Sequence, residues 1–272
     1  MNLLRPSFLA CLLSLVASAQ EPVALEKAYV IEGTFDTFTT DELGNVYALQ
    51  GDELRLFDAR GRSWLRNSTK TFGRIGTIDA FYSLKPMLFA PEQGQIAMLD
   101  NTLSLQGSVI NLPRKGFPQV VQACMSVQNC FWFFDQQEMA LIRVDNQLRR
   151  LAHTGRLDQV LGFTVEPLDL QELDARLYVN AGRKGILVFD LFGTYMKTIG
   201  ITGARCMQVR DNAILFMDGT GIHRYDMRSF AIVDIATTHP AEEIRALRAE
   251  GSRVYLLLAD RIEVLQAADA DH

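Results

Sequence analysis

The chain has 272 residues, of which 27 are basic and 32 acidic, and its formal net charge is −5. A balance this acidic disfavours nucleic acid or an anionic membrane surface as the main partner. A chain of this length can bury about 70–75% of its unfolded surface in one core. We therefore expect a globular protein that does not need disulfides for its stability.

The first residues of the chain have the parts of a secretory signal peptide. Arg5 supplies a positive start, an apolar run follows at 8–16, and ASA at 17–19 is a small-x-small cleavage site. The run is shorter than the ~20 residues of a membrane-spanning helix. Cys11 offers a lipoprotein alternative, but the apolar run continues past it. We expect residues 1–19 to be removed from an exported protein, periplasmic or secreted, that keeps no integral membrane segment.

A short strand is expected next, at 28–31 (AYVI), and a repeat begins after it. Each repeat carries an apolar pair followed by Asp, with Arg in the first place of two copies. The five copies end at Asp58, Asp100, Asp145, Asp190 and Asp226, and a degenerate sixth ends at Gln266. Their spacings of 42, 45, 45, 36 and 40 residues are close to the ~40–45 residues of a four-stranded propeller blade.

The clearest copy of the repeat is the stretch 186–201, ILVFDLFGTYMKTIGI. Its four leading apolar residues are typical of a strand covered on both faces. Asp190 and Gly193 then bracket a tight turn, because Asp caps turn backbone and Gly accepts a positive φ. Alternating apolar and polar residues from Tyr195 onward predict a half-exposed strand.

Each repeat divides into four short strands, which we letter A to D from the inside of a blade outward. The expected A strands are 35–39, 78–83, 120–125, 168–172, 207–209 and 244–247. Aromatic or β-branched B strands follow at 46–49, 87–89, 131–134, 177–179, 214–217 and 254–258. The apolar-Asp pairs end the C strands, and D strands are expected at 63–66, 105–110, 148–153, 195–201 and 230–236.

The sixth repeat has no D strand of its own, because it ends at 264–266 and only the polar tail 267–272 follows. The strand at 28–31, in turn, has no blade. Pairing the two closes a ring and removes an open edge that invites aggregation. The prediction is an all-β, six-bladed β-propeller with four-stranded blades, formed by one domain over 28–266. Residues 241–249 (AEEIRALRA) could alternatively form one or two helical turns before the last blade.

Three segments carry a family resemblance: 42–61, 98–112 and 185–201. They resemble six-bladed β-propellers of the NHL/YVTN-like type, and most closely exported bacterial propellers of unsettled function. The resemblance covers residues 28 to 266 and implies the architecture. It implies no activity, since propellers serve as enzymes, binding modules and scaffolds alike.

Cysteine spacing leaves two alternatives open. Cys124 and Cys130 flank the short turn at 126–129 and could face each other as a disulfide in an oxidising compartment, or remain free thiols. Cys206 would then be an odd thiol, typically a buried small hydrophobe. No pair of cysteines has zinc-site spacing with a nearby histidine.

A propeller enzyme would need reactive groups that converge on the central channel. The candidates near inner strands are Asp36, Asp79, Glu172 and Asp211. They do not occupy equivalent positions in successive repeats, and calcium needs six to eight oxygen ligands. The four histidines are not paired, and no Gly-x-Ser-x-Gly motif is present. We expect no catalytic residue, cofactor or metal site; a metal-dependent hydrolase or lactonase-like enzyme and a small-ligand sensor are the alternatives.

The D–A and B–C connections of a propeller share one face, and here they are rich in basic and aromatic residues. The expected partner-binding residues are Arg74, Arg114, Lys115, Phe117, Arg156, Phe163, Arg183, Lys184 and Arg205. Arg and aromatic side chains supply most of the energy of protein interfaces. The prediction is a non-catalytic module, a monomer or a subunit of a hetero-complex, that binds another envelope protein or scaffolds an assembly such as a secretion system.

Overall fold

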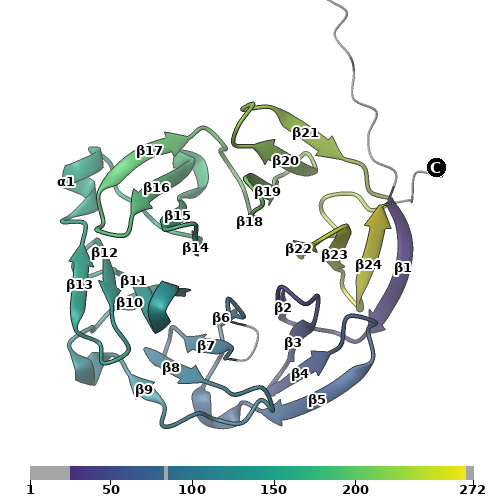
Figure 1. Ribbon diagram of the computed structural model, residues 1–272, viewed down its shortest axis with the longest axis horizontal. Helices are drawn as coiled ribbons and strands as arrows, with labels where there is room; N and C mark the ends of the chain where they lie inside the picture. The colour runs from purple at the N-terminus through teal and green to yellow at the C-terminus, as the bar shows by residue number, and fades with distance from the viewer. Residues whose placement is uncertain (1–24, 83–84, 268–272) are drawn as a thin grey trace, which may run out of the picture.

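The computed structural model describes residues 25–82 and 85–267. Within these residues, six four-stranded antiparallel sheets stand around a central axis as the blades of a β-propeller (Figure 1). The predicted fold class is therefore confirmed. The expected signal peptide and residues 268–272 of the expected tail lie outside the described residues. No helix of the described segments is both long and apolar enough to cross a bilayer.

The strands follow the order of the chain, with the A strand of each blade nearest the axis. Blade 1 contains β2 (Thr37–Thr40), β3 (Val46–Gln50), β4 (Glu53–Phe57) and β5 (Ser63–Ser68). Blade 2 contains β6 (Thr77–Asp79), β7 (Met87–Ala90), β8 (Gln95–Met98) and β9 (Ile110–Asn111). Blade 3 contains β10 (Val120–Ser126), β11 (Cys130–Asp135), β12 (Ala140–Val144) and β13 (Arg150–His153).

The second half of the ring repeats this order. Blade 4 contains β14 (Asp169–Leu173), β15 (Arg176–Asn180), β16 (Ile186–Asp190) and β17 (Tyr195–Ile199). Blade 5 contains β18 (Cys206–Arg210), β19 (Ala213–Met217), β20 (Ile222–Asp226) and β21 (Ile232–Ile235). Blade 6 contains β22 (Ala246–Glu250), β23 (Arg253–Leu257), β24 (Arg261–Ala267) and the first strand, β1 (Leu25–Glu32).

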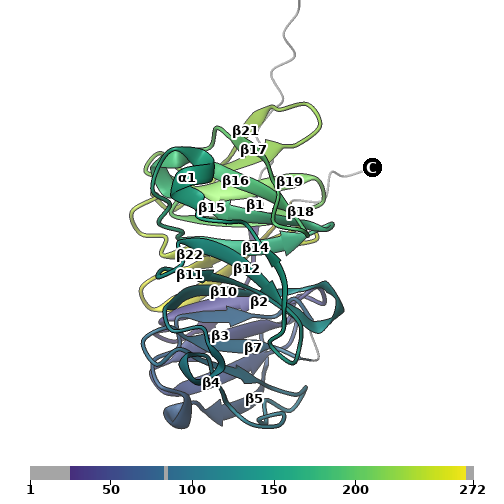
Figure 2. The same cartoon turned by 90° about the vertical axis from the view of Figure 1, so that its left-hand side faces the viewer.

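Short helical turns occur in the connections between strands. The 3-10 turns are η1 (Lys70–Phe72), η2 (Pro113–Lys115), η3 (Val127–Asn129) and η4 (Gly182–Lys184). The D–A connection from blade 3 to blade 4 forms a short α-helix, α1 (Leu157–Leu161). In Figure 2 this helix lies at the left of the molecule, on the side of the D–A and B–C connections.

The recurring Asp has a turn-capping role between strands C and D. In blade 4, Asp190 Oδ1 accepts hydrogen bonds from the backbone N–H groups of Phe192 (2.9 Å) and Thr194 (2.8 Å). Gly193 has a φ of +81° in the same turn. Because an Asp side chain caps turn backbone in this way, the repeat visible in the sequence marks the C–D turn of blades 1 to 5.

The first strand closes the ring, as the strand count predicts. β1 pairs antiparallel with β24, and Ile31 lies opposite Ile262. Ile31 is 2% exposed. It packs in a cluster with Phe35, which precedes β2, and with Phe57 at the end of β4 in blade 1. The strand therefore joins both the hydrogen bonds of blade 6 and the core between blades 6 and 1.

Two expected elements differ from the structure. Residues 241–249 form no helix, because a turn is followed here by the strand β22. Leu247 of β22 is 1% exposed and packs between blades. Tertiary packing thus overrides a helix-like local pattern. The D strand of blade 2 is much shorter than expected, because only β9 pairs regularly and Leu105 makes a single bridge to Leu99.

Candidate functional site

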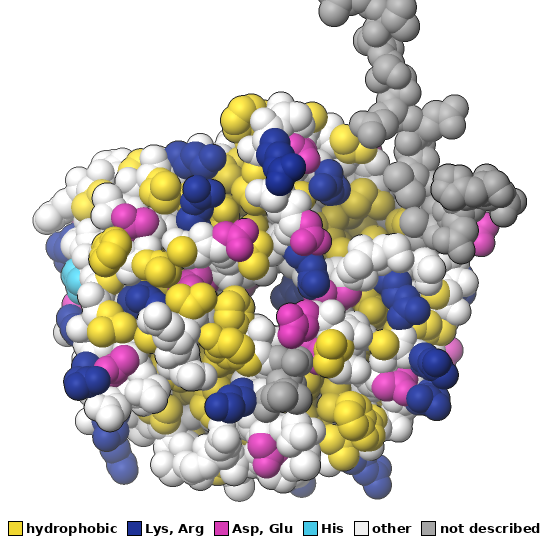
Figure 3. Space-filling view, in the orientation of Figure 1, with side chains coloured by type: hydrophobic (Ala, Val, Ile, Leu, Met, Phe, Trp, Pro, Cys, Tyr) yellow, Lys and Arg dark blue, Asp and Glu magenta, His cyan; other side chains and the backbone are white. Residues whose placement is uncertain are grey.

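A cavity of about 630 Å³ lies in the central channel. Its walls come from the A strands and from the A–B turns, so it opens at the end of the channel that carries those turns. Figure 3 looks onto this end, where basic and acidic side chains lie at the right of the central hollow and hydrophobic side chains lie at its left.

The third residue of an A strand repeatedly bonds the backbone of the next blade. Gln171 accepts from Val209 N (2.7 Å) and donates to Val209 O (3.0 Å). Gln208 accepts from Ala249 N (2.6 Å) and donates to Ala249 O (3.0 Å). Asp79 holds the same strand position and accepts from a backbone N–H of blade 3 at 2.7 Å. These side chains join neighbouring blades around the channel.

The expected carboxylate candidates fall into different environments. Glu172 is 1% exposed and accepts from Trp132 Nε1 (2.7 Å) and from a backbone N–H of blade 3 (3.0 Å). Asp79, Glu172 and Asp211 line the cavity, whereas Asp36 lies elsewhere and accepts from Gly51 N. Within 25–82 and 85–267, no three His, Cys, Asp or Glu side chains are grouped as a metal site.

Asp169, which sequence reasoning missed, shares the cavity with Asp79. Burial raises the pKa of Asp79, and it raises the pKa of Asp169 to about 6; the charge of Arg248 acts against both shifts. Arg248 Nε lies 3.4 Å from Thr39 Oγ1, and its Nη1 donates to a backbone carbonyl at 3.0 Å. The cavity therefore holds half-buried charges of both signs.

The opposite face carries the residues expected to bind a partner. Several contacts show that D–A and B–C connections meet there: Arg74 of the first D–A connection lies 3.7 Å from Glu92 of a B–C turn. Similarly, Gly203 N donates to Gly182 O between a D–A and a B–C connection. The placement of these connections on one face follows the sequence-based expectation.

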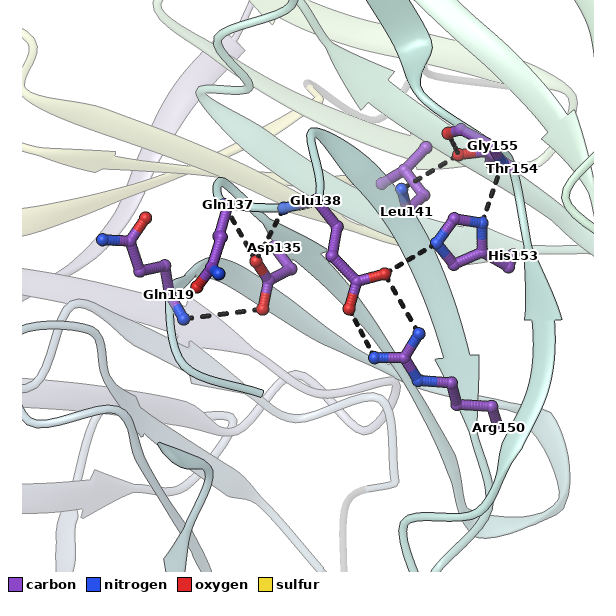
Figure 4. A network of polar contacts seen from close by, with 9 residues as sticks. All are labelled: Gln119, Asp135, Gln137, Glu138, Leu141, Arg150, His153, Thr154 and Gly155. Atoms are coloured by element: carbon purple, nitrogen blue, oxygen red, sulfur yellow. Dashed lines mark hydrogen bonds and ion pairs between the residues drawn. The ribbon is translucent and has the colours of Figure 1, made fainter. Parts of the chain in front are cut away.

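Phe117 does not belong to the surface, which corrects the expectation of an exposed aromatic tip. Its side chain is 2% exposed and packs edge-to-face on Phe133, with ring centroids 5.3 Å apart. The Arg150 guanidinium also lies over the Phe117 ring, 5.3 Å from its centre. Figure 4 shows how Glu138 pairs with Arg150 and with His153, both on β13. These contacts hold the Arg150 cation in its place over the Phe117 ring. The ring closes the core between blades 2 and 3.

Three of the expected cations are already engaged. Arg74 pairs with Glu92, and Arg156 pairs with Asp158 at 2.9 Å. Arg205 donates to two backbone carbonyls, at 3.1 and 2.8 Å. The remaining cations are exposed and make no ion pair with any described residue; they are Arg114, Lys115, Arg183 and Lys184.

One group of residues on this face combines cations with apolar surface, and we call it the α1 patch: Val160, Phe163, Leu168, Arg183 and Lys184. Val160 and Leu168 are 51% and 53% exposed. Lys184 Nζ lies 5.0 Å from the centre of the half-buried Phe163 ring. Leu168 lies against Gly182, directly before Arg183. Sequence reasoning named three of the five; the length of the connection at 154–167 was the signal for the others.

Cys124 and Cys130 do not face each other across the hairpin. In the hairpin of blade 3, Cys130 lies opposite Ser126 and Cys124 lies opposite Trp132. Cys124 and Cys130 are offset by two positions and are free thiols in this structure, as is Cys206. Burial raises the pKa of Cys124 well above its ordinary value and also raises that of Cys130.

Comparison with known proteins identifies the class of fold. No family model and no curated protein matches the chain. Among solved structures, a streptogramin B lyase is 15% identical with a TM-score of 0.63, over 90% of this chain and 98% of that one. Virginiamycin B lyase from Staphylococcus aureus is 10% identical (TM-score 0.62; 90% and 99%), and BBS1N in complex with ARL6DN is 11% identical (0.54; 92% and 78%). These similarities show a six-bladed β-propeller.

Proposed function

We propose that this protein is a non-catalytic binding module of a bacterial cell-envelope assembly. It binds another protein through the α1 patch on its D–A/B–C face. The predicted signal peptide supports export, and a secretion-system accessory is one form of this role. The fold alone does not choose between functions, since its structural neighbours include lyases and a propeller in complex with ARL6DN.

The observation that carries the proposal is the exposure of Leu168 and Val160 on the face that also carries the exposed cations Arg183 and Lys184. More than half of each apolar side chain contacts water, although removing such a side chain from water is worth roughly 1 kcal/mol or more. Clustered apolar surface rimmed by charge is typical of interaction sites. The cations Arg183 and Lys184 favour an acidic partner surface that carries apolar side chains of its own.

Affinity purification from the native envelope, followed by mass spectrometry, tests the proposal. We expect the Leu168→Glu and Lys184→Glu variants to lose a partner that the unchanged protein recovers. Trp64→Glu is the matched control, because Trp64 is 61% exposed on β5, away from the patch. Equal recovery of the same partners by all three variants would contradict the proposed interface.

A further inference from the structure

The channel cavity contains charged atoms that the protein itself leaves without a partner. Asp169 Oδ1 accepts from a backbone N–H at 2.9 Å, and no described residue donates to its second oxygen. Arg248 uses Nε and Nη1 for protein contacts, and in the described chain its Nη2 has none. Both residues line the cavity. One free carboxylate oxygen and one free guanidinium nitrogen are therefore available in the same space.

Four other polar side chains of the cavity wall already have partners in the protein. Gln171 and Gln208 bond the backbone of the next blade, and Glu172 bonds Trp132. Glu250 pairs with Arg210 and also accepts from Thr40 Oγ1 at 2.9 Å. A ligand thus meets a polar frame in which Asp169 and Arg248 each keep one atom free to bond.

Retaining Asp169 has a cost in stability. Burial opposes the charged form of Asp169 at neutral pH, and the charge of Arg248 offsets only part of this effect. An asparagine would keep the bond to the backbone without that charge. Residues that oppose stability in this way occur preferentially at functional sites.

The mixture of charges limits what the cavity can hold. A simple polyamine would be repelled by Arg248, and a simple anion by Asp79 and Asp169 and by the exposed Asp174 and Asp211 at the rim. A molecule with a cation at one end and an anion at the other meets a complementary group at each end. The volume of about 630 Å³ lies within the ~300–1,000 Å³ of typical ligand pockets.

We propose that the channel cavity binds a small zwitterion, a free amino acid or a dipeptide, with its ammonium at Asp169 and its carboxylate at Arg248. This site opens on the face of the A–B turns, whereas the α1 patch lies on the opposite face of the propeller. It does not depend on the partner proposed above.

Isothermal titration calorimetry with the protein tests this, using L-alanine, L-glutamate, L-lysine and dialanine as probes. We expect at least one amino acid or dialanine to bind, and its N-acetylated and C-amidated forms to bind at least tenfold more weakly. The single amino acids and dialanine distinguish the two ligand sizes. Absence of heat for all four probes at millimolar concentration, or equal binding of the blocked forms, would overturn the proposal.

Two variants that remove a charge but keep a polar side chain locate the site. Asp169→Asn and Arg248→Gln should each weaken binding at least tenfold, whereas Asp52→Asn, on a B–C turn outside the cavity, should not change it. Circular dichroism and thermal melting of each variant show whether it folds. Unchanged affinity in a folded Asp169→Asn protein would contradict the assignment, and Arg248→Gln gives the same test if that variant is unstable.

Discussion

The Nζ of Lys27 on the first strand lies 3.3 Å from Oε2 of Glu263 on the last. The Glu263 side chain is 2% exposed, and His239 Nε2 (3.2 Å) and Arg261 Nε (3.4 Å) also contact it. Although burial works to raise the pKa of Glu263, the hydrogen bonds from His239 and Lys27 hold it below its ordinary value. This carboxylate therefore joins both ends of the chain where the ring closes.

Replacing Glu263 with Gln should destabilise the protein by about 1.5–3 kcal/mol, because charge-assisted bonds to a buried carboxylate are lost. Lys27→Ala should cost less than about 1 kcal/mol, since 56% of the Lys27 side chain is exposed. Urea unfolding at pH 7 measures both. Equal losses in the two variants would contradict a closure that depends on Glu263.

The same carboxylate gives a dependence on pH. Because the folded-state pKa of Glu263 lies below its ordinary value of 4.5, its stabilisation is present above that value and disappears as the pH falls through the folded pKa. The stability difference between wild type and Glu263→Gln should shrink as the pH is lowered below 4.5. Urea titrations at several pH values check this; a constant difference would show that the charge of Glu263 is not responsible.

The contacts between blades predict a second stability effect. Gln171→Ala and Gln208→Ala each remove two hydrogen bonds to the backbone of the next blade. Each should cost about 1–3 kcal/mol, since buried backbone groups lose their partners. Gln159→Ala, on the exposed side of α1, is the control and should stay within about 0.5 kcal/mol. If Gln171→Ala and Gln208→Ala lose no more stability than the control, these side chains do not hold neighbouring blades together.

Residues of the D–A connection before β10 should differ strongly in how much their replacement changes stability. Phe117→Ala should destabilise by about 3–5 kcal/mol, because it opens a cavity beside Phe133. Arg114→Ala and Lys115→Ala should change stability by less than about 0.5 kcal/mol, since both side chains are exposed. Thermal melting distinguishes the two outcomes, and a neutral Phe117→Ala variant would argue against its place in the core.

Replacing Asp169 should stabilise the protein, whereas replacing most residues of a protein interior destabilises it. Its folded-state pKa of about 6 is above the ordinary value of 3.8, so its effect favours folding most below pH 3.8 and is lost as the pH rises through 6. Asp169→Asn should therefore stabilise the protein by about 1–3 kcal/mol at pH 7 and flatten its stability between pH 4 and 6. Loss of stability in this variant at pH 7 would contradict the desolvation of Asp169.

The fold was predictable because its signals are local and repeated. An Asp at the end of the C strand caps the C–D turn in five blades. The residue with positive φ that follows it is a glycine in two of them, at 61 and 193, and Leu103, Leu148 or Phe230 in the others. The missing D strand of the last blade and the unassigned strand at 28–31 then left one way to close the ring. These signals depend on backbone geometry, which short stretches of sequence carry well.

The site was harder to predict because it depends on contacts between blades. Phe117 and Leu168 both lie in D–A connections, yet one is 2% and the other 53% exposed. Local spacing does not say which of them meets a neighbouring blade. The segment at 241–249 has helical spacing, but Gln208 bonds the backbone of Ala249 and keeps it extended. Asp169 was missed because desolvation comes from residues distant in sequence.

Site-specific photo-crosslinking in the native envelope tests the central claim, that the α1 patch contacts a protein partner. A benzophenone side chain at position 168 should give one discrete crosslinked product, and the same group at position 64, on β5, should not. Lys184→Glu should abolish the product at 168. Equal crosslinking at both positions, or none at 168, would contradict the claim.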